Sequence, residues 1–150
     1  MNKVIFLDID GVLINRAALM ARRANQGKWQ ADPQCVEELN RIVKTTGAKI
    51  VVSSTWRFEG FDRIREILQD WGVCAEVIGV TPDFTRKKTS ESRGQEIAHW
   101  LRDNPADRIV IIDDDSDMDH LIDQLVNTQF EIGLTVANAD QAIALLMKEA

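Results

Sequence analysis

Short apolar, β-branched runs recur along this chain and alternate with segments whose apolar residues have helical spacing. The runs cover residues 3–7, 49–52, 76–80 and 108–112, with a weaker one at 130–135. The run at 3–7 (KVIFL) is apolar at nearly every position, which is typical of a strand buried on both faces. Alternation of strands and helices predicts a mainly parallel sheet with helices on both sides. We therefore expect a Rossmann-like, three-layer α/β/α fold.

Residues that favour helix ends mark the boundaries of the helices. Asp32-Pro33 is typical of an N-cap followed by a first turn, and Gly47 of a terminator. The helical patterns cover residues 33–46, 61–71, 93–103, 118–125 and a last segment that Asn138 is expected to cap. Segments 12–31 and 81–92 are too short to form a separate cap domain. We expect one domain over residues 1–150, with a minimal cap.

Composition excludes some classes of protein. No apolar stretch reaches the roughly 18 residues that a membrane span needs. The apolar N-terminal run is broken by Asp8 and Asp10, unlike that of a signal peptide, so a cytoplasmic location is expected. The net charge of −6 argues against a broad nucleic-acid-binding surface. This net charge does not exclude a local cluster of basic residues at the entrance of a site that binds an anionic substrate.

Three of the expected strands end in carboxylates or hydroxyls. The first ends in Asp8-Ile9-Asp10-Gly11, the second in Ser53-Ser54-Thr55, and the fourth in Asp113-Asp114-Asp115-Ser116-Asp117. Asp and Ser favour turns in any protein, so one such strand end carries little weight. Three together, directly after apolar strands, indicate a site at the carboxyl edge of the sheet, where ligands bind in folds of this class.

The residue types at these strand ends favour magnesium. Clustered carboxylates raise each other's pKa unless a cation neutralises them. Oxygen ligands without His or Cys suit Mg²⁺ better than zinc or copper, and we interpret His99 and His120 as structural or solvent-facing. Magnesium held by a few carboxylates commonly partners a phosphate, so we expect phosphate chemistry.

The same residues resemble the motifs of the haloacid dehalogenase (HAD) superfamily of phosphohydrolases. DIDGVL at 8–13 is similar to its first motif, DxDG[TV], and VVSS at 51–54 to its second. Arg93 is in the place of the third, a Lys or Arg, and IVIIDDDSD at 109–117 resembles the acidic fourth. SSTWR, RGQEIAHWL and the late GLT resemble the HAD domains of Swiss-army-knife RNA repair proteins. The resemblance spans nearly the whole chain.

The resemblance implies a role for each residue of the first motif. Asp8 would be the nucleophile that forms an aspartyl-phosphate. Asp10 would protonate the leaving oxygen and then activate water. Asp8 and the backbone carbonyl of Asp10 would ligate Mg²⁺. Gly11 permits the sharp exit of the chain from the strand, beside the substrate.

The other motifs leave alternatives open. Ser53 would donate a hydrogen bond to the phosphoryl group, with Ser54 as the rival. Arg93 would neutralise charge on Asp8 and on the phosphoryl oxygens, with Lys87 or Lys88 as competitors. The best metal ligands of the fourth motif are Asp113 and Asp114, with Asp117 as a further candidate, whereas Asp115 and Asp119 are expected to face solvent or cap a helix.

Residues near these motifs have weaker claims. Trp56 could stack on a base and Arg57 could bind phosphate, but the role favoured for Trp56 is structural packing. A basic flap over the site could be formed by Arg16, Arg22, Arg23 and Lys28, unless they only solvate a helix face.

The function that these residues imply is a Mg²⁺-dependent phosphatase acting on a phosphorylated small molecule or a nucleic-acid end. Two alternatives are a receiver-like phospho-acceptor domain and a non-catalytic HAD-like binding domain. Receiver domains carry their phospho-acceptor Asp after the third strand, where this chain has AEVIGV and no Asp. The oligomeric state is not indicated by the sequence.

Overall fold

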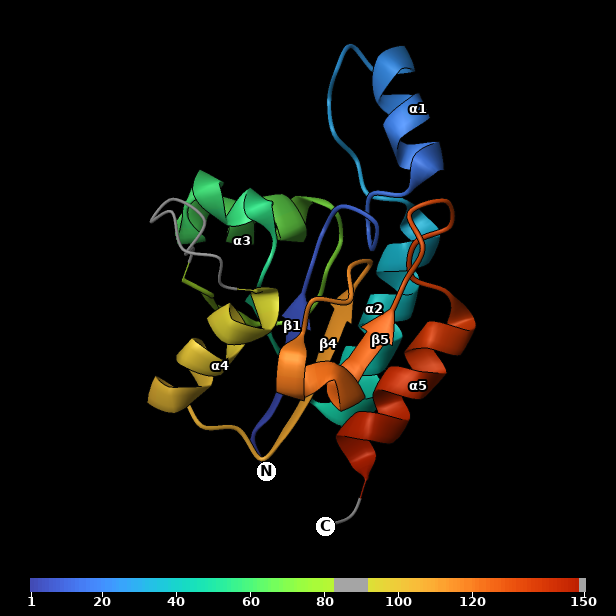
Figure 1. The fold of residues 1–150 in the computed structure, drawn as a ribbon. Helices are drawn as coiled ribbons and strands as arrows, with labels where there is room; N and C mark the ends of the chain where they lie inside the picture. Colours follow the sequence, from blue (N-terminus) through green and yellow to red (C-terminus); the bar gives the residue numbers. More distant parts are fainter. Residues whose placement is uncertain (83–91, 149–150) are drawn as a thin grey trace.

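A computed structural model describes residues 1–82 and 92–148 of the chain, with five parallel strands in one sheet (Figure 1). The strands, in the order β3-β2-β1-β4-β5, are β3 (Val77–Val80), β2 (Lys49–Val52), β1 (Lys3–Leu7), β4 (Arg108–Asp113) and β5 (Leu125–Asn127). The order reverses between β1 and β4, which are hydrogen-bonded neighbours. The expected Rossmann-like α/β fold is confirmed.

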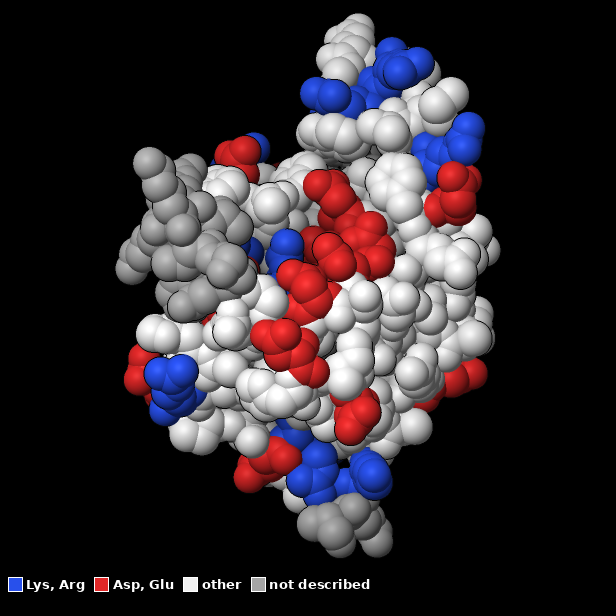
Figure 2. Space-filling view, viewed as in Figure 1, with Lys and Arg blue, Asp and Glu red and all other residues white. Residues whose placement is uncertain are grey.

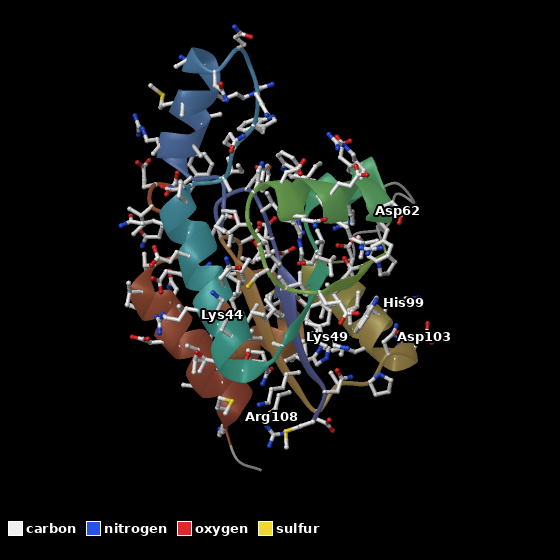
Figure 3. All side chains as sticks on the ribbon, turned by 180° about the vertical axis from the view of Figure 1, so that it is seen from behind. Lys44, Lys49, Asp62, His99, Asp103 and Arg108 are labelled. Carbon is white, nitrogen blue, oxygen red and sulfur yellow. The ribbon has the colours of Figure 1, made fainter. Side chains whose placement is uncertain are left out.

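Helices cover both faces of the sheet. They are α1 (Arg16–Ala24), α2 (Pro33–Thr46), α3 (Phe61–Asp70), α4 (Arg93–Asp103) and α5 (Val136–Met147), with the 3₁₀ turns η1 (Thr55–Glu59) and η3 (Asp119–Gln124). Apolar residues of α2, α3 and α5 belong to one core cluster, and those of α4 and η3 to another. Seen from behind, α2 with Lys44 lies beside α5, whereas α4 carries His99 and Asp103 (Figure 3).

The central strand β1 is buried on both faces, as KVIFL predicts. Ile5 and Leu7 point into the core beneath α2 and α5, and Val4 and Phe6 into the core beneath α4. Side chains alternate across a strand, so a strand between two helical layers needs apolar residues at every position. This burial positions the end of β1 rigidly for the residues that follow it.

The helix-end signals are confirmed at α2. The Asp32 carboxylate accepts a hydrogen bond from the Gln34 backbone N–H, and Pro33 occupies the first turn. Gly47 ends the helix with a φ of 74°. That left-handed conformation carries no steric penalty in glycine.

The segment after the acidic run differs from the expected helix over 118–125. Only Asp119–Gln124 is helical, as the 3₁₀ turn η3, and Leu125 already begins β5. Leu125 pairs with Ile111 of β4, so sheet pairing overrides the helical spacing of the apolar residues. The fifth strand therefore lies earlier in the chain than expected.

The predicted strand at 130–135 is wrong, and so is the expected cap at Asn138. The Gly133 N–H donates to the Gln129 carbonyl, closing a turn that leads into α5. Thr135 is the N-cap of α5. Its side chain accepts from the Asn138 N–H, while the Asn138 side chain accepts from the Thr135 N–H. Asn138 thus closes a capping box from inside the helix.

The middle of segment 12–31, which is α1 and the loop after it, forms a short projection above the carboxyl edge of the sheet (Figure 1). Its helix α1 is capped by Asn15, whose side chain accepts from the Ala18 N–H. The Asn15 amide also donates to Asp32 and to the Ile132 carbonyl, which ties the base of the projection to the body. This single helix is the minimal cap expected from the length of the segment.

Among the residues that the structure describes, no helix combines the length and the apolar character that a membrane crossing requires.

Candidate active site

Two strand ends meet where the strand order reverses. The Asp8 N–H donates to the Ile112 carbonyl at 3.0 Å, which places the end of β1 directly beside the end of β4. On the other side of β4, the Thr128 N–H donates to the Asp113 carbonyl at 3.0 Å. Backbone pairing therefore holds Asp8 and Asp113 side by side, at the edge where α/β sheets bind ligands.

Three carboxylates converge at this edge. Asp8, Asp113 and Asp114 each offer one oxygen, and these oxygens lie within 4.8 Å of one another. Asp8 and Asp113 are only 6% and 1% exposed, whereas Asp114 is exposed. Acidic side chains gather around this point on the surface (Figure 2). The sequence prediction that the first and fourth motifs meet is thus fulfilled in the geometry.

Burial makes this cluster electrostatically costly. Burial raises the pKa of Asp8 well above its usual range, and the neighbouring Asp113 raises it further, while Arg93 opposes both. Burial also raises the pKa of Asp113, again against the influence of Arg93. One Asp113 oxygen, Oδ2, is buried and has no hydrogen-bond partner among the described residues. Such a group calls for a proton or a cation.

Gly11 allows the acidic loop to reach the first motif. Its φ is +86°, and a Cβ at this position would overlap the carboxylate of Asp114. Its carbonyl accepts a hydrogen bond of 2.7 Å from the Thr128 hydroxyl. Gly11 therefore acts in the packing of the site, while its expected contact with substrate stays a prediction.

Arg93 lies at the edge of the acidic cluster. Its Nε is 3.7 Å from Asp113 Oδ2, and its buried Nη1 has no hydrogen-bond partner in the described part of the chain. The backbone N–H of Arg93 donates to Asp117 Oδ2. Asp117 thus stabilises the start of α4 and lies outside the group of three converging carboxylates. The competing residues Lys87 and Lys88 lie outside the described residues.

Gly94 is a structural residue that sequence reasoning missed. A Cβ on Gly94 would collide with the backbone of Met118, and the Gly94 N–H donates to the Asp117 carbonyl at 3.1 Å. This close approach brings the N-terminus of α4, with Arg93, against the acidic loop. A glycine early in a helix, where it costs stability, was the available signal.

Asp10 lies outside the group of three converging carboxylates and is bound by Trp56. The indole Nε1 donates a hydrogen bond of 3.1 Å to Asp10 Oδ1. Burial raises the pKa of Asp10, and this hydrogen bond opposes the rise. The Trp56 ring packs edge-on against Trp29 and Trp71, with centroids 5.9 and 5.3 Å away. Trp56 therefore packs against two other tryptophans and also orients Asp10. Its expected stacking on a base remains a prediction.

The two serines after β2 have different environments. Ser54 Oγ accepts a hydrogen bond from the Trp56 N–H and caps η1. Ser53 Oγ is fully buried and has no partner among the described residues. Ser53 is consequently the serine that remains available to a ligand oxygen.

Arg57 is turned inward and stabilises the turn after β2. Its guanidinium donates to the carbonyls of Ser53 and Ser54 and forms a 3.0 Å ion pair with Glu96 of α4. Both side chains of this pair are 4% exposed. The predicted phosphate contact of Arg57 stays untested, but these bonds assign it a structural role that links η1 to α4.

Breaking this buried pair should destabilise the fold strongly. Arg57→Met would remove the guanidinium that forms the ion pair with the buried Glu96 carboxylate, and breaking buried pairs of this kind costs about 3–5 kcal/mol. Urea unfolding of the variant measures the loss. The matched control is Arg63→Met, because Arg63 pairs with Glu66 at 3.1 Å while both side chains are mostly exposed. That variant should unfold close to the wild-type midpoint. Equal stability of the two variants would contradict the structural role of Arg57.

The basic residues of the projection are exposed or have contacts outside the group of three converging carboxylates. Arg16 pairs with Glu131, and Arg22 lies 4.3 Å above the Trp29 ring and donates to the Gly27 carbonyl. Arg23 and Lys28 are exposed. Lys and Arg side chains gather on the projection above the acidic patch (Figure 2). His99 and His120 are exposed, outside the acidic cluster.

The arrangement suits attack on an electrophile bound to a cation. A buried carboxylate lies beside two others, a guanidinium reaches their edge, and a fourth carboxylate, Asp10, is oriented by an indole. Hard oxygen ligands of this kind match Mg²⁺.

Comparison with protein families agrees with this geometry. The family of HAD domains in Swiss Army Knife RNA repair proteins matches residues 4–139. That range includes the carboxylates after β1 and β4, Ser53 and Arg93. Comparison with curated proteins gives no significant match. The chain belongs to the family of HAD domains found in Swiss Army Knife RNA repair proteins.

Proposed function

We propose that this chain is a Mg²⁺-dependent phosphatase that hydrolyses phosphomonoesters through an aspartyl-phosphate on Asp8. Membership of the HAD family supports phosphohydrolase activity in general. The observation that carries the finer proposal is the convergence of Asp8, Asp113 and Asp114 beside Arg93 at the end of β1 and β4. The proposal treats residues 1–150 as one catalytic domain.

The donor set fits magnesium. Asp8, Asp113 and Asp114 would hold the ion, together with the backbone carbonyl of Asp10. The buried Oδ2 of Asp113, which has no hydrogen-bond partner in the described part of the chain, is the group that most needs such a partner. When bound, the cation would keep these carboxylates ionised and offset the charge of the phosphate.

Each residue then has one task in two half-reactions. An Asp8 carboxylate oxygen attacks phosphorus, and the bond from phosphorus to the ester oxygen breaks as Asp10 gives that oxygen its proton. Asp10 next takes a proton from water, whose oxygen attacks the same phosphorus and releases Asp8 and inorganic phosphate. Ser53 and Arg93 would donate hydrogen bonds to the phosphoryl oxygens in both steps.

The phospho-acceptor alternative has less support. Strand β3 ends at Val80, and the first Asp of the sequence after it, Asp83, comes only after Thr81-Pro82, whereas a receiver domain carries its Asp at the end of this strand. The acidic cluster instead follows β1 and β4. This arrangement favours turnover over a stable phosphorylated state.

A screen of phosphate esters tests the proposed function. Purified protein with Mg²⁺ should release inorganic phosphate from at least one class among sugar phosphates, nucleotides and oligonucleotides phosphorylated at either end. Among the described segments, the short helix α1 is the one that projects above the site, and such a small cap leaves room for a bulky substrate, so the screen must include the oligonucleotides. Absence of phosphate release from every ester, with a well-folded protein and Mg²⁺ present, would refute a phosphatase.

A further inference from the structure

An aromatic groove lies directly beside Asp10. It has a volume of about 580 Å³, within the range of small-molecule sites. The groove is lined by Asp10, Leu19, Trp29, Trp56, Phe58 and Phe130, among others. These residues come from the turn after β1, from α1 and the loop after it, from η1 and from the loop after β5. The projection thus helps to form one wall of the groove.

The groove exposes aromatic side chains that a purely structural role would bury. Phe58 is 49% exposed and Phe130 is 37% exposed. Trp29 and Trp56 stand in edge-to-face contact with each other and present a rigid aromatic wall. Exposed, clustered aromatic residues in a concave surface are typical of a binding site.

The position of Asp10 determines which part of a substrate would enter the groove. In the proposed function Asp10 protonates the leaving oxygen, and the Asp10 carboxylate is itself part of the groove wall. The Trp56 indole, which lines the same groove, holds this carboxylate at 3.1 Å. Whatever is joined to the leaving oxygen must therefore extend into the groove.

The lining favours a neutral, planar group. Among the lining residues that the structure describes, the charged ones are Asp10 and Glu59, and none is a Lys or Arg. A second phosphate would be repelled there, whereas a flat ring can stack on aromatic side chains.

We propose that this groove is the leaving-group subsite and that Phe58 and Phe130 select phosphomonoesters of nucleosides by stacking on the nucleobase. This inference rests on the proposed function and adds the substrate class. The nucleoside can be free or can stand at the end of an oligonucleotide, since both present the same ring to the groove.

Two matched pairs of substrates separate these sources. The first pair is a nucleoside 5′-monophosphate and ribose 5-phosphate, which share the ester and differ in the base. The second pair is a phosphorylated oligonucleotide with a normal terminal nucleotide and one with an abasic terminal residue. We expect kcat/KM to favour the base-containing member of at least one pair by about 10- to 100-fold.

Variants of the groove should reduce this ratio. Phe58→Ala and Phe130→Ala should each bring it several-fold closer to one, and Phe58→Leu, which keeps apolar volume without an aromatic face, should do the same. The ratio does not depend on the fraction of folded protein, so a general loss of stability does not imitate the result. Val136→Ala on α5, an exposed apolar residue outside the groove, is the matched control and should keep the wild-type ratio.

The outcomes are distinct. If the kcat/KM ratio is near one for both pairs while phosphate is released, the groove does not select the nucleobase, and the proposed phosphatase activity is unaffected. Selection by stacking is likewise overturned if Phe58→Leu keeps the full preference, because apolar contact would then replace stacking. No phosphate from any of the four esters would instead count against the proposed function itself.

Discussion

Asp8→Asn is expected to abolish both phosphoenzyme formation and turnover. The variant replaces the attacking carboxylate by an amide of almost the same shape, so the fold should be kept while the nucleophile is lost. Removing a buried carboxylate that lies against Asp113 should even relieve repulsion in the metal-free protein. Circular dichroism and thermal unfolding check the fold, and phosphate release checks the activity.

Asp10→Asn separates the two carboxylates of the first motif. The variant should slow both half-reactions by about 10²–10⁴-fold, the usual contribution of a positioned acid–base group. With 4-nitrophenyl phosphate, whose leaving group needs no proton, Asp10→Asn should still phosphorylate Asp8. The intermediate should then accumulate, because no group activates water.

Rapid-quench mass spectrometry with peptide mapping locates the phosphate in that variant. If the phosphate is found on Asp10 or on an aspartate after β4, that residue and not Asp8 is the nucleophile. Formation of product in a single turnover without any phosphoenzyme would indicate that a cation-bound water molecule attacks phosphorus directly. Asp115→Asn is the matched control, since Asp115 is an exposed aspartate outside the converging group, and it should keep near-wild-type turnover.

Removal of divalent cations is expected to eliminate phosphatase activity, and Mg²⁺ should restore it. Burial raises the pKa of Asp8 and of Asp113 even with Arg93 nearby, so their ionised forms need a further positive charge, which a cation at the three converging carboxylates would supply. Excess chelator followed by titration with Mg²⁺ measures the dependence. Undiminished turnover in chelator would remove the cation from the proposed mechanism. Asp114→Asn, which removes the exposed member of the three, should raise the Mg²⁺ concentration needed for half-maximal activity.

The pH dependence of the stability of the folded protein should also reveal binding of the cation. The pKa of Asp8 and that of Asp113 are raised in the folded protein, so above about pH 4 the folded state holds protons that the unfolded chain has released. Stability of the metal-free protein should therefore fall as the pH rises from about 4 through neutrality. Mg²⁺ takes the place of these protons, so its stabilising effect should be larger at pH 8 than at pH 5. Thermal unfolding with and without Mg²⁺ at both pH values measures this difference, and an equal effect would contradict metal binding at the buried pair.

Much of the fold could be predicted from local patterns. KVIFL is expected to be buried on both faces because every position after Lys3 is apolar, and Asp32, Pro33 and Gly47 mark the ends of α2 by their backbone preferences. The pattern at 118–125 wrongly predicted one helix, because helical spacing over a short segment is a weak local signal. Pairing of Leu125 with Ile111 added β5 to the sheet, and no periodicity within the segment reveals such a partner.

The sequence by itself determined which residue types reach the carboxyl edge of the sheet, because acidic and hydroxyl residues directly follow apolar strands. Only the tertiary structure decided which of them converge. Asp8, Asp113 and Asp114 meet because β1 and β4 are neighbours, while Asp117 is bound to the start of α4. It also decided between neighbours in the chain, leaving Ser53 available where Ser54 caps η1. Arg57 is turned to Glu96, 39 residues away, because a buried guanidinium needs a carboxylate that only long-range packing can supply.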